Sequence, residues 1–221
     1  DVLRCDQAVL DLTIKNSFQV VGDVSSSKAV LEYYPLNSYR QQVLNVTTIP
    51  KALQTTTGFE YIFGNSNNNQ LFLKAKIVTH AKQSLVRDAP FPLQVPDSLR
   101  TFLKPGIITD TNNDIKQLAV QLTSNANSEL EAVSNIAEWI INNVQYNLST
   151  SNVKASKPST WVFANRQGVC DEITSLFISM LRSVGIPARF VSGIAFTDYP
   201  GIEGWGGHGW AEVYFPQGWV P

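Results

Sequence analysis

The stretch RQGVCDE, residues 166–172, places a cysteine where an extended segment gives way to a helix. After Cys170 the apolar residues fall three or four positions apart, which predicts a helix with a broad buried face: Ile173, Leu176, Phe177, Met180, Leu181 and Val184. Gly185 can adopt the left-handed conformation that ends a helix, and Pro187 prevents its continuation. A thiol at a helix start lies beside the partial positive charge of the helix N-terminus, which favours the nucleophilic thiolate. Taken alone, Cys170 fits better as a small apolar residue of a buried helix.

His208 supplies the second half of a candidate cysteine nucleophile. It follows Cys170 by 38 residues, in Gly-His-Gly-Trp at 207–210. An imidazole within hydrogen-bond reach can take the proton of a thiol. Aromatic and β-branched residues predict short strands over 190–194 and 210–215, with a flexible loop over 199–206 between them. Glycines at 206, 207 and 209 leave the backbone around His208 without side chains, which suits either close approach of a substrate or a loop turn.

Four ordered blocks extend this pattern: RQGVC at 166–170, GIPARFVSG at 185–193, HGWAEVY at 208–214 and GWVP at 218–221. Over residues 114–221 they closely resemble the core of the transglutaminase-like superfamily, and the chain resembles microbial members with a β domain ahead of the catalytic one. The resemblance implies a papain-like α+β catalytic core in which Cys170 is the nucleophile and His208, beginning a strand, faces it. It also implies a third catalytic residue, an Asp that orients the imidazole, about two positions past Pro221.

Three further residues are candidates for substrate or oxyanion support: Trp161, Gly207 and Trp210. Animal transglutaminases use a Trp to stabilise the oxyanion, but that Trp lies much further upstream than Trp161, which is nine residues before Cys170. Packing is therefore the favoured interpretation for Trp161. The oxyanion donor that we expect is the backbone N–H of Cys170, at the start of its helix.

The first half of the chain has a different pattern. Apolar residues alternate over 10–14, 59–63 and 71–77, and a Gly/Asn-rich turn at 64–69 separates the last two runs. With strands over 30–34 and 42–46 added, residues 1–88 are predicted to form an antiparallel β-sandwich domain. Prolines then predict a stiff linker over residues 89–113: Pro90, Pro92, Pro96 and Pro105. Helices follow, one of them opened by a capping box of Ser128 and Glu131, so the predicted fold class is α+β.

Composition sets limits on partners and cofactors. Seventeen basic and 18 acidic residues give a net charge of −1 without runs of like charge, which argues against nucleic acid as the main ligand. No apolar stretch approaches the roughly 18 residues of a membrane span. With His80 and His208 as the two histidines, a zinc site has little support, and residues 110–114 fit a helix cap better than a calcium loop. We expect no metal and no cofactor.

The two cysteines, Cys5 and Cys170, are expected not to pair with each other, because a disulfide would remove the nucleophile. The charged fraction is only 16%, and Asn, Ser and Thr are abundant. This surface chemistry suits an extracytoplasmic or cell-surface protein of a microbe.

The sequence therefore predicts a thiol-dependent hydrolase or acyltransferase that acts on amide bonds of proteins or peptides through a thioester. The superfamily includes protein crosslinkers, proteases and peptide N-glycanases built on the same site, and the sequence does not choose among them. The alternative is a catalytically inactive transglutaminase-like scaffold or binding module at the cell surface.

Overall fold

A computed structural model of the chain describes residues 6–81, 86–152, 156–198 and 203–221, without the side chains of residues 151 and 152. The chain forms two compact units, Asp1–Gln83 and Ser84–Pro221. Cys5 lies outside the described residues. Among the described residues, no helix is long and apolar enough to cross a membrane.

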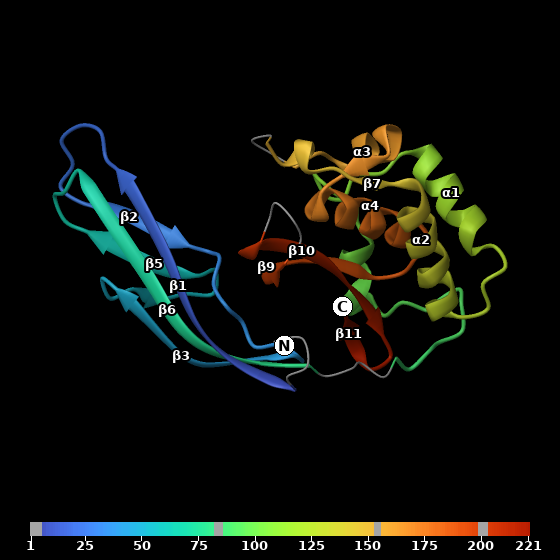
Figure 1. The fold of residues 1–221 in the computed structure, drawn as a ribbon, viewed down its shortest axis with the longest axis horizontal. Helices are drawn as coiled ribbons and strands as arrows, with labels where there is room; N and C mark the ends of the chain where they lie inside the picture. Colours follow the sequence, from blue (N-terminus) through green and yellow to red (C-terminus); the bar gives the residue numbers. More distant parts are fainter. Residues whose placement is uncertain (1–5, 82–85, 153–155, 199–202) are drawn as a thin grey trace. The chain divides into compact units, whose positions relative to one another are not determined.

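Over residues 6–81, the first unit forms two antiparallel three-stranded sheets (Figure 1). One sheet has the order β1(Gln7–Gln19), β6(Asn68–His80), β3(Gln41–Ile49), and the other β2(Ser27–Leu31), β5(Phe59–Phe63), β4(Leu53–Gln54). Alternate side chains of β6 are buried, and they pack with Phe59 and Tyr61 of β5 in one core cluster. The predicted β-sandwich is confirmed. Side chains alternate along each strand, so each sheet has one apolar face, and the two faces are buried together.

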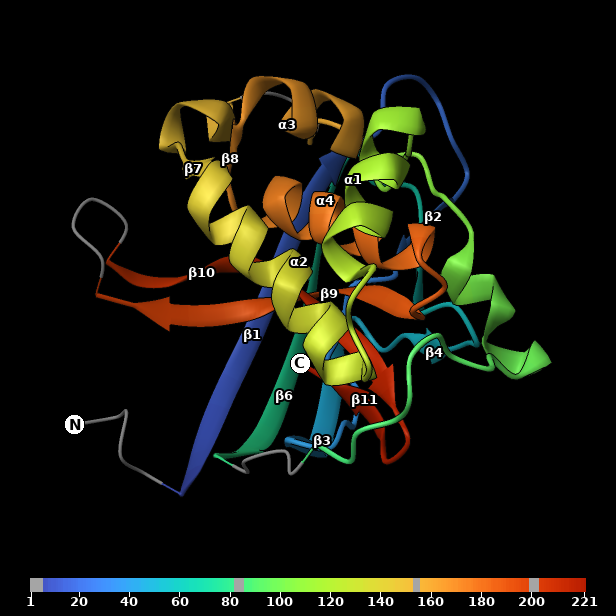
Figure 2. The ribbon, with the colours of Figure 1, turned by 90° about the vertical axis from the view of Figure 1, so that its right-hand side faces the viewer.

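In its described residues, the second unit combines four α-helices with a small antiparallel sheet. The helices are α1(Asn113–Thr123), α2(Glu129–Asn143), α3(Ser159–Asn165) and α4(Cys170–Ser183). The sheet has the order β11(Gly218–Val220), β10(Gly204–Phe215), β9(Ala188–Thr197). Figure 2 shows α1 and α2 side by side, and α4 packs against α1, α2, α3, β9 and β10. The unit is completed by the 3₁₀ helices η2(Asp97–Leu103) and η3(Leu148–Asn152) and by the parallel pair β7(Gln145–Tyr146) and β8(Gln167–Gly168). The predicted α+β class is confirmed.

Helix α4 lies at the centre of the second core, as its apolar spacing predicts. Leu176, Ile178, Met180 and Leu181 are fully buried there. The helix ends as expected at Gly185, which has a φ of +83°. The N–H of Ile186 then bonds to the carbonyl of Leu181, at 3.0 Å, which closes the helix end. The start of α4 is thus carried on a rigid, buried element.

Two expected segments differ in the structure. The linker expected over residues 89–113 belongs to the second unit. The carboxylate of Asp88 accepts a hydrogen bond from the N–H of Leu130, and the carbonyl of Ala89 accepts one from the N–H of Glu129. These bonds satisfy N–H groups at the start of α2 that have no partner within the helix. The proline-containing segment therefore lies along the second unit. Strand β10 begins at Gly204, so His208 lies inside a strand and does not begin one, and residues 204–206 are not loop.

Candidate active site

Cys170 is the first residue of α4, half-buried and unpaired among the described residues. Glu172, 1% exposed, fixes this helix start with its carboxylate. The carboxylate accepts from the N–H of Val169 at 3.1 Å, from the Thr150 hydroxyl at 2.8 Å and from the N–H of Lys157 at 3.0 Å. Gly168 is required here, since a Cβ would lie 2.9 Å from the Cβ of Glu172. The helix N-terminus beside Cys170 is therefore held from three segments.

Tyr146 lies directly beside Cys170. The short parallel ladder of β7 and β8 pairs Tyr146 with Gly168, two residues before the cysteine. The Tyr146 hydroxyl lies close enough to Cys170 to interact with both its backbone and its thiol. Burial of the hydroxyl end and the charge of a Cys170 thiolate raise the pKa of Tyr146. The phenol thus stays protonated and can donate a hydrogen bond at this site.

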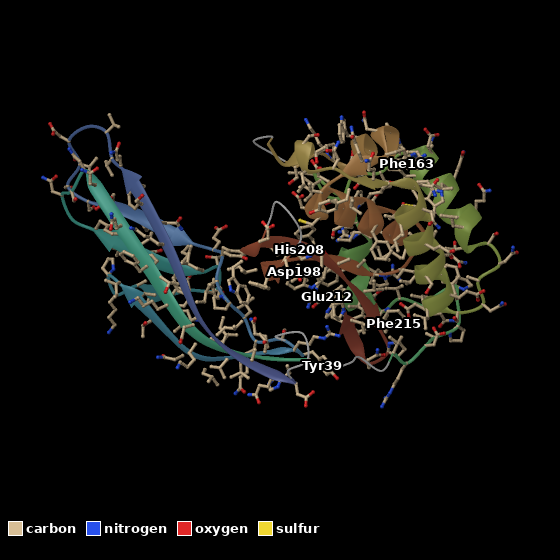
Figure 3. The ribbon with its side chains drawn as sticks, viewed as in Figure 1. Tyr39, Phe163, Asp198, His208, Glu212 and Phe215 are labelled. Carbon is tan, nitrogen blue, oxygen red and sulfur yellow. The ribbon has the colours of Figure 1, made fainter. Side chains whose placement is uncertain are left out.

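His208 is exposed on β10, opposite Gly193 of β9. Figure 3 labels it on this strand. The hydroxyl of Thr174, one turn after Cys170, donates to the carbonyl of Gly209 at 3.3 Å. The N–H of Tyr214 donates to the carbonyl of Pro187, so the backbone groups of Tyr214 point toward β9. In an antiparallel ladder this direction alternates from one residue to the next, so the carbonyl of Gly209 points away from β9. The first turns of α4 therefore meet β10 at its other edge, next to His208.

The structure brings the backbone segments of the two residues together but does not join their side chains. Among the described residues, no hydrogen bond links the Cys170 thiol and the His208 imidazole. The imidazole stacks on Trp210 instead, with centroids 6.2 Å apart and ring planes at 28°. In structures without substrate, catalytic hydrogen bonds are often long and tighten only when substrate binds.

Two glycines of the sheet make room for aromatic rings around His208. A Cβ at Gly193 would lie 2.5 Å from the Trp210 indole, so the indole crosses the bare backbone opposite His208. A Cβ at Gly209 would lie 2.4 Å from the Phe190 ring. Nothing lies within 4 Å of a Cβ position at Gly207, which leaves this stretch of β10 open. The glycine pattern around His208 is therefore partly packing and partly open space.

Glu212 shares a strand face with His208 but is already paired. Its carboxylate binds Arg189 at 2.6 and 2.7 Å, and the Arg189 guanidinium lies 4.3 Å from the centre of the Trp219 ring. Figure 3 labels Glu212 further along β10 than His208. Glu212 therefore does not serve as the carboxylate that orients the imidazole.

A model of the transglutaminase-like superfamily matches residues 116–221. These residues make up most of the second unit, which is therefore similar to transglutaminase-like domains. The resemblance drawn from the sequence is thereby confirmed, and the chain has the general fold of thiol enzymes.

Several relatives share this domain. The chain is 30% identical over 144 residues to protein YebA of Bacillus subtilis, which covers 58% of this chain and 18% of YebA. It is 29% identical over 141 residues to a protein of Mycobacterium tuberculosis, which covers 59% and 43%. The chain thus spans less than half the length of these relatives.

Solved structures share the fold. A proposed cysteine protease from Cytophaga hutchinsonii superposes with a TM-score of 0.67 at 19% identity, covering 97% of this chain and 76% of that one. The periplasmic domain of TgpA from Pseudomonas aeruginosa gives a TM-score of 0.49 at 17% identity, covering 96% and 68%. The structure from Cytophaga hutchinsonii shows that the fold of this chain occurs in another protein.

Within the second unit, Trp161 takes the packing position. It lies in α3 against the second core, and the ammonium of Lys157 lies 5.7 Å from its ring centre.

Asn112 caps α1 by accepting from the N–H of Ile115, as the helix-cap interpretation predicts. Asp110 binds the N–H and hydroxyl of Thr160. Among the described residues, no three potential metal ligands come together.

Sequence reasoning missed the contacts that build the site. The sequence pattern does not reveal the position of Tyr146 beside Cys170, because a two-residue parallel ladder has no periodicity to detect. Glu172 resembles any acidic residue of a first helical turn, and only its burial marks it as structural. Thr174 falls on the helix face that Cys170 also occupies, and that spacing was the one available signal.

Proposed function

We propose that this protein is a thiol-dependent hydrolase or acyltransferase that acts on amide bonds of proteins or peptides. The supporting observation is the bond between Thr174 and Gly209, which holds the Cys170 helix start against the strand segment of His208. A helix N-terminus favours the thiolate, and a neighbouring imidazole is the base that such a nucleophile needs.

The reaction proceeds through a thioester. Cys170 loses its proton to His208, and its sulfur attacks the amide carbonyl to give a tetrahedral oxyanion. The carbon–nitrogen bond then breaks, and the imidazolium gives its proton to the leaving amine. Water or a second amine attacks the thioester, loses a proton to His208 and releases the thiol. Hydrolysis and acyl transfer differ only in this acceptor.

Two donors beside the sulfur can stabilise the oxyanion. The backbone N–H of Cys170 lies at the free N-terminus of α4, beside the Tyr146 hydroxyl. A substrate carbonyl that replaces the phenol at this N–H leaves the Tyr146 O–H free to donate to the same oxygen. We place both groups in the oxyanion hole, where one donor is worth about 10²–10³ in turnover.

The register of β11 supports a place for the orienting carboxylate. Val213 pairs with Val220 and Tyr214 with Trp219, so a strand that continues in register sets residue 223 opposite Trp210. Residue 223 then lies diagonal to His208 on the same sheet face, within reach of the imidazole. An Asp about two positions past Pro221 is the third catalytic residue in this proposal. We place the protein outside the cytoplasm, which its low charged fraction of 16% supports.

Ester turnover by the full-length protein tests the proposal. We expect a burst of one equivalent of p-nitrophenol from an activated ester, followed by slower turnover that an added primary amine accelerates if the protein is an acyltransferase. Cys170→Ala should abolish the burst, whereas Cys5→Ser, a change of the other thiol, should keep it. A protein that is folded but gives no burst, or the same burst in Cys170→Ala, would favour the inactive scaffold.

A further inference from the structure

A cavity of about 200 Å³ lies in the second unit, at the end of β10 far from His208. Its walls come from residues 89–99, the start of α2, Pro187 and residues 214–216. Figure 3 labels both His208 and Phe215 on β10, and seven residues of strand separate them by about 20 Å. The cavity is therefore distinct from the candidate active site. It is lined mainly by apolar side chains: Leu93, Val95, Pro96, Leu99, Pro187 and Phe215.

The lining also includes Gln94 and Tyr214, and Glu129 adds a carboxyl group to it. Glu129 is 1% exposed, and its buried Oε1 has no hydrogen-bond partner among the residues that the structure describes. Its backbone is fixed, because its N–H donates to the carbonyl of Ala89 at 2.8 Å. A buried acceptor without a partner is unfavourable in a folded protein, and a ligand that donates to it removes this cost.

The charges around Glu129 favour a cation. Asp88 lies at the same helix start, where its carboxylate accepts from the N–H groups of Ala89 and Leu130. Glu131, in the same turn of α2, is acidic as well and binds the N–H of Asn127. Tyr214 is the other titratable residue of the lining, and none of the described lining residues is basic. A bound ammonium would meet one buried carboxylate and no competing positive charge in the lining.

We propose that this cavity binds a small primary amine whose ammonium pairs with Glu129 and whose apolar body fills the space beside it. Size supports this class, because a cavity of about 150 Å³ is enough for benzene. Tyr214 and Phe215 line the cavity, and aromatic faces attract ammonium groups. The amine is an effector or a ligand at a second site, since the cavity is too far from Cys170 for it to accept an acyl group there.

Binding should depend on pH through Glu129. Burial and the nearby charge of Asp88 raise the pKa of Glu129 to about 7. The carboxyl is mostly ionised at pH 8 and mostly neutral at pH 6, whereas a primary alkylamine stays protonated at both. Affinity for the amine should therefore fall about tenfold from pH 8 to pH 6.

Calorimetric titration with benzylamine and benzyl alcohol tests this site, since the two probes differ in charge but little in shape. At pH 8 we expect benzylamine to bind one site at least tenfold more tightly than the alcohol. Glu129→Gln should abolish this preference, and the control Glu138→Gln, an exposed position on the same helix, should keep it. Leu99→Trp, which fills the cavity but keeps the carboxyl, should weaken binding of both probes.

Three results would overturn the proposal. One is equal binding of amine and alcohol by the wild-type protein, which would show a merely apolar cavity. Another is benzylamine affinity that is unchanged in Glu129→Gln or Leu99→Trp, which would place the amine elsewhere. The third is no detectable binding at millimolar benzylamine. None of these results bears on the ester burst, so the cavity and the thiol chemistry are tested separately.

Discussion

At the scale of single residues, Tyr146 is the clearest addition to the Cys170–His208 pair. Its hydroxyl interacts with both the backbone and the thiol of Cys170, and its pKa is raised, so it remains a donor under neutral conditions. A phenol in this position has two consequences: it holds the resting thiol, and it is available to the oxyanion once a substrate carbonyl takes the Cys170 N–H. The hydroxyl, and not the ring, should carry its effect on the reaction.

Tyr146→Phe removes that hydroxyl alone. We expect the rate of acylation by an activated ester to fall about 10–10²-fold, toward the loss of one oxyanion donor, while the fold is kept. Single-turnover release of p-nitrophenol measures this rate. Tyr33→Phe, which changes an exposed tyrosine of the first unit, is the matched control and should have no effect. Equal acylation rates in Tyr146→Phe and wild type would remove Tyr146 from the oxyanion hole.

At the scale of elements, the start of α4 depends on one buried carboxylate. Glu172 receives three donors, from Val169, Thr150 and Lys157. In Glu172→Gln the amide NH₂ must face at least one of these N–H or O–H groups. We expect a loss of about 1–3 kcal/mol in the free energy of unfolding, because a buried donor is left without an acceptor.

Urea unfolding followed by tryptophan fluorescence measures this loss. All five tryptophans lie between residues 139 and 219, so the signal reports the second unit and not the first. Glu138→Gln, an exposed carboxylate of α2, is the control and should cost little. A loss in Glu172→Gln no greater than in this control would show that the helix start does not depend on the carboxylate.

The strand pair β9–β10 gives a second test at this scale. Gly209→Ala places a methyl group 2.4 Å from the Phe190 ring, so we expect a loss of about 1–3 kcal/mol from overpacking. Phe190→Leu in the same chain should relieve part of that loss, which a double-mutant cycle in urea detects. Strict additivity of the two changes would contradict the close packing of this ring on the bare strand.

Elements that rest on local pattern were predictable from the sequence, and contacts between distant segments were not. The apolar spacing after Cys170 and the turn at Gly185 give α4 its course, and alternation gives the strands of the first unit. The extended β10 was missed because Gly204, Gly206 and Gly207 suggest a loop, whereas β9 pairs with them as a strand. Likewise, the packing of residues 88–91 against the start of α2 follows from bonds of Asp88 and Ala89 that no periodicity reveals.

At the scale of the whole molecule, the two units have separate cores, and the second contains a buried acid that opposes its stability. Burial and the charge of Asp88 raise the pKa of Glu129 from 4.5 to about 7. The folded state therefore binds a proton more tightly than the unfolded state. Stability from this group is fully present below pH 4.5 and is lost as pH rises to 7.

Glu129→Gln should remove this pH dependence. A pKa difference of this size corresponds to about 3 kcal/mol, so the variant should be more stable than wild type at pH 8 by up to that amount. Near pH 4.5 the advantage should be much smaller. Urea unfolding at both pH values, followed by tryptophan fluorescence, measures the difference. A variant that is less stable than wild type at pH 8 would show that the ionised carboxylate is stabilised by contacts in the fold.

The covalent state of Cys170 during turnover is the most direct test of thiol catalysis. The full-length protein is mixed with an activated ester, quenched with acid and digested, and the acylated peptide is identified by mass. We predict one acyl group, on the peptide that contains Cys170, formed at least 100-fold more slowly in His208→Ala. An acyl group on another residue, no acyl group at all, or the same rate in His208→Ala would contradict a Cys170–His208 catalytic pair.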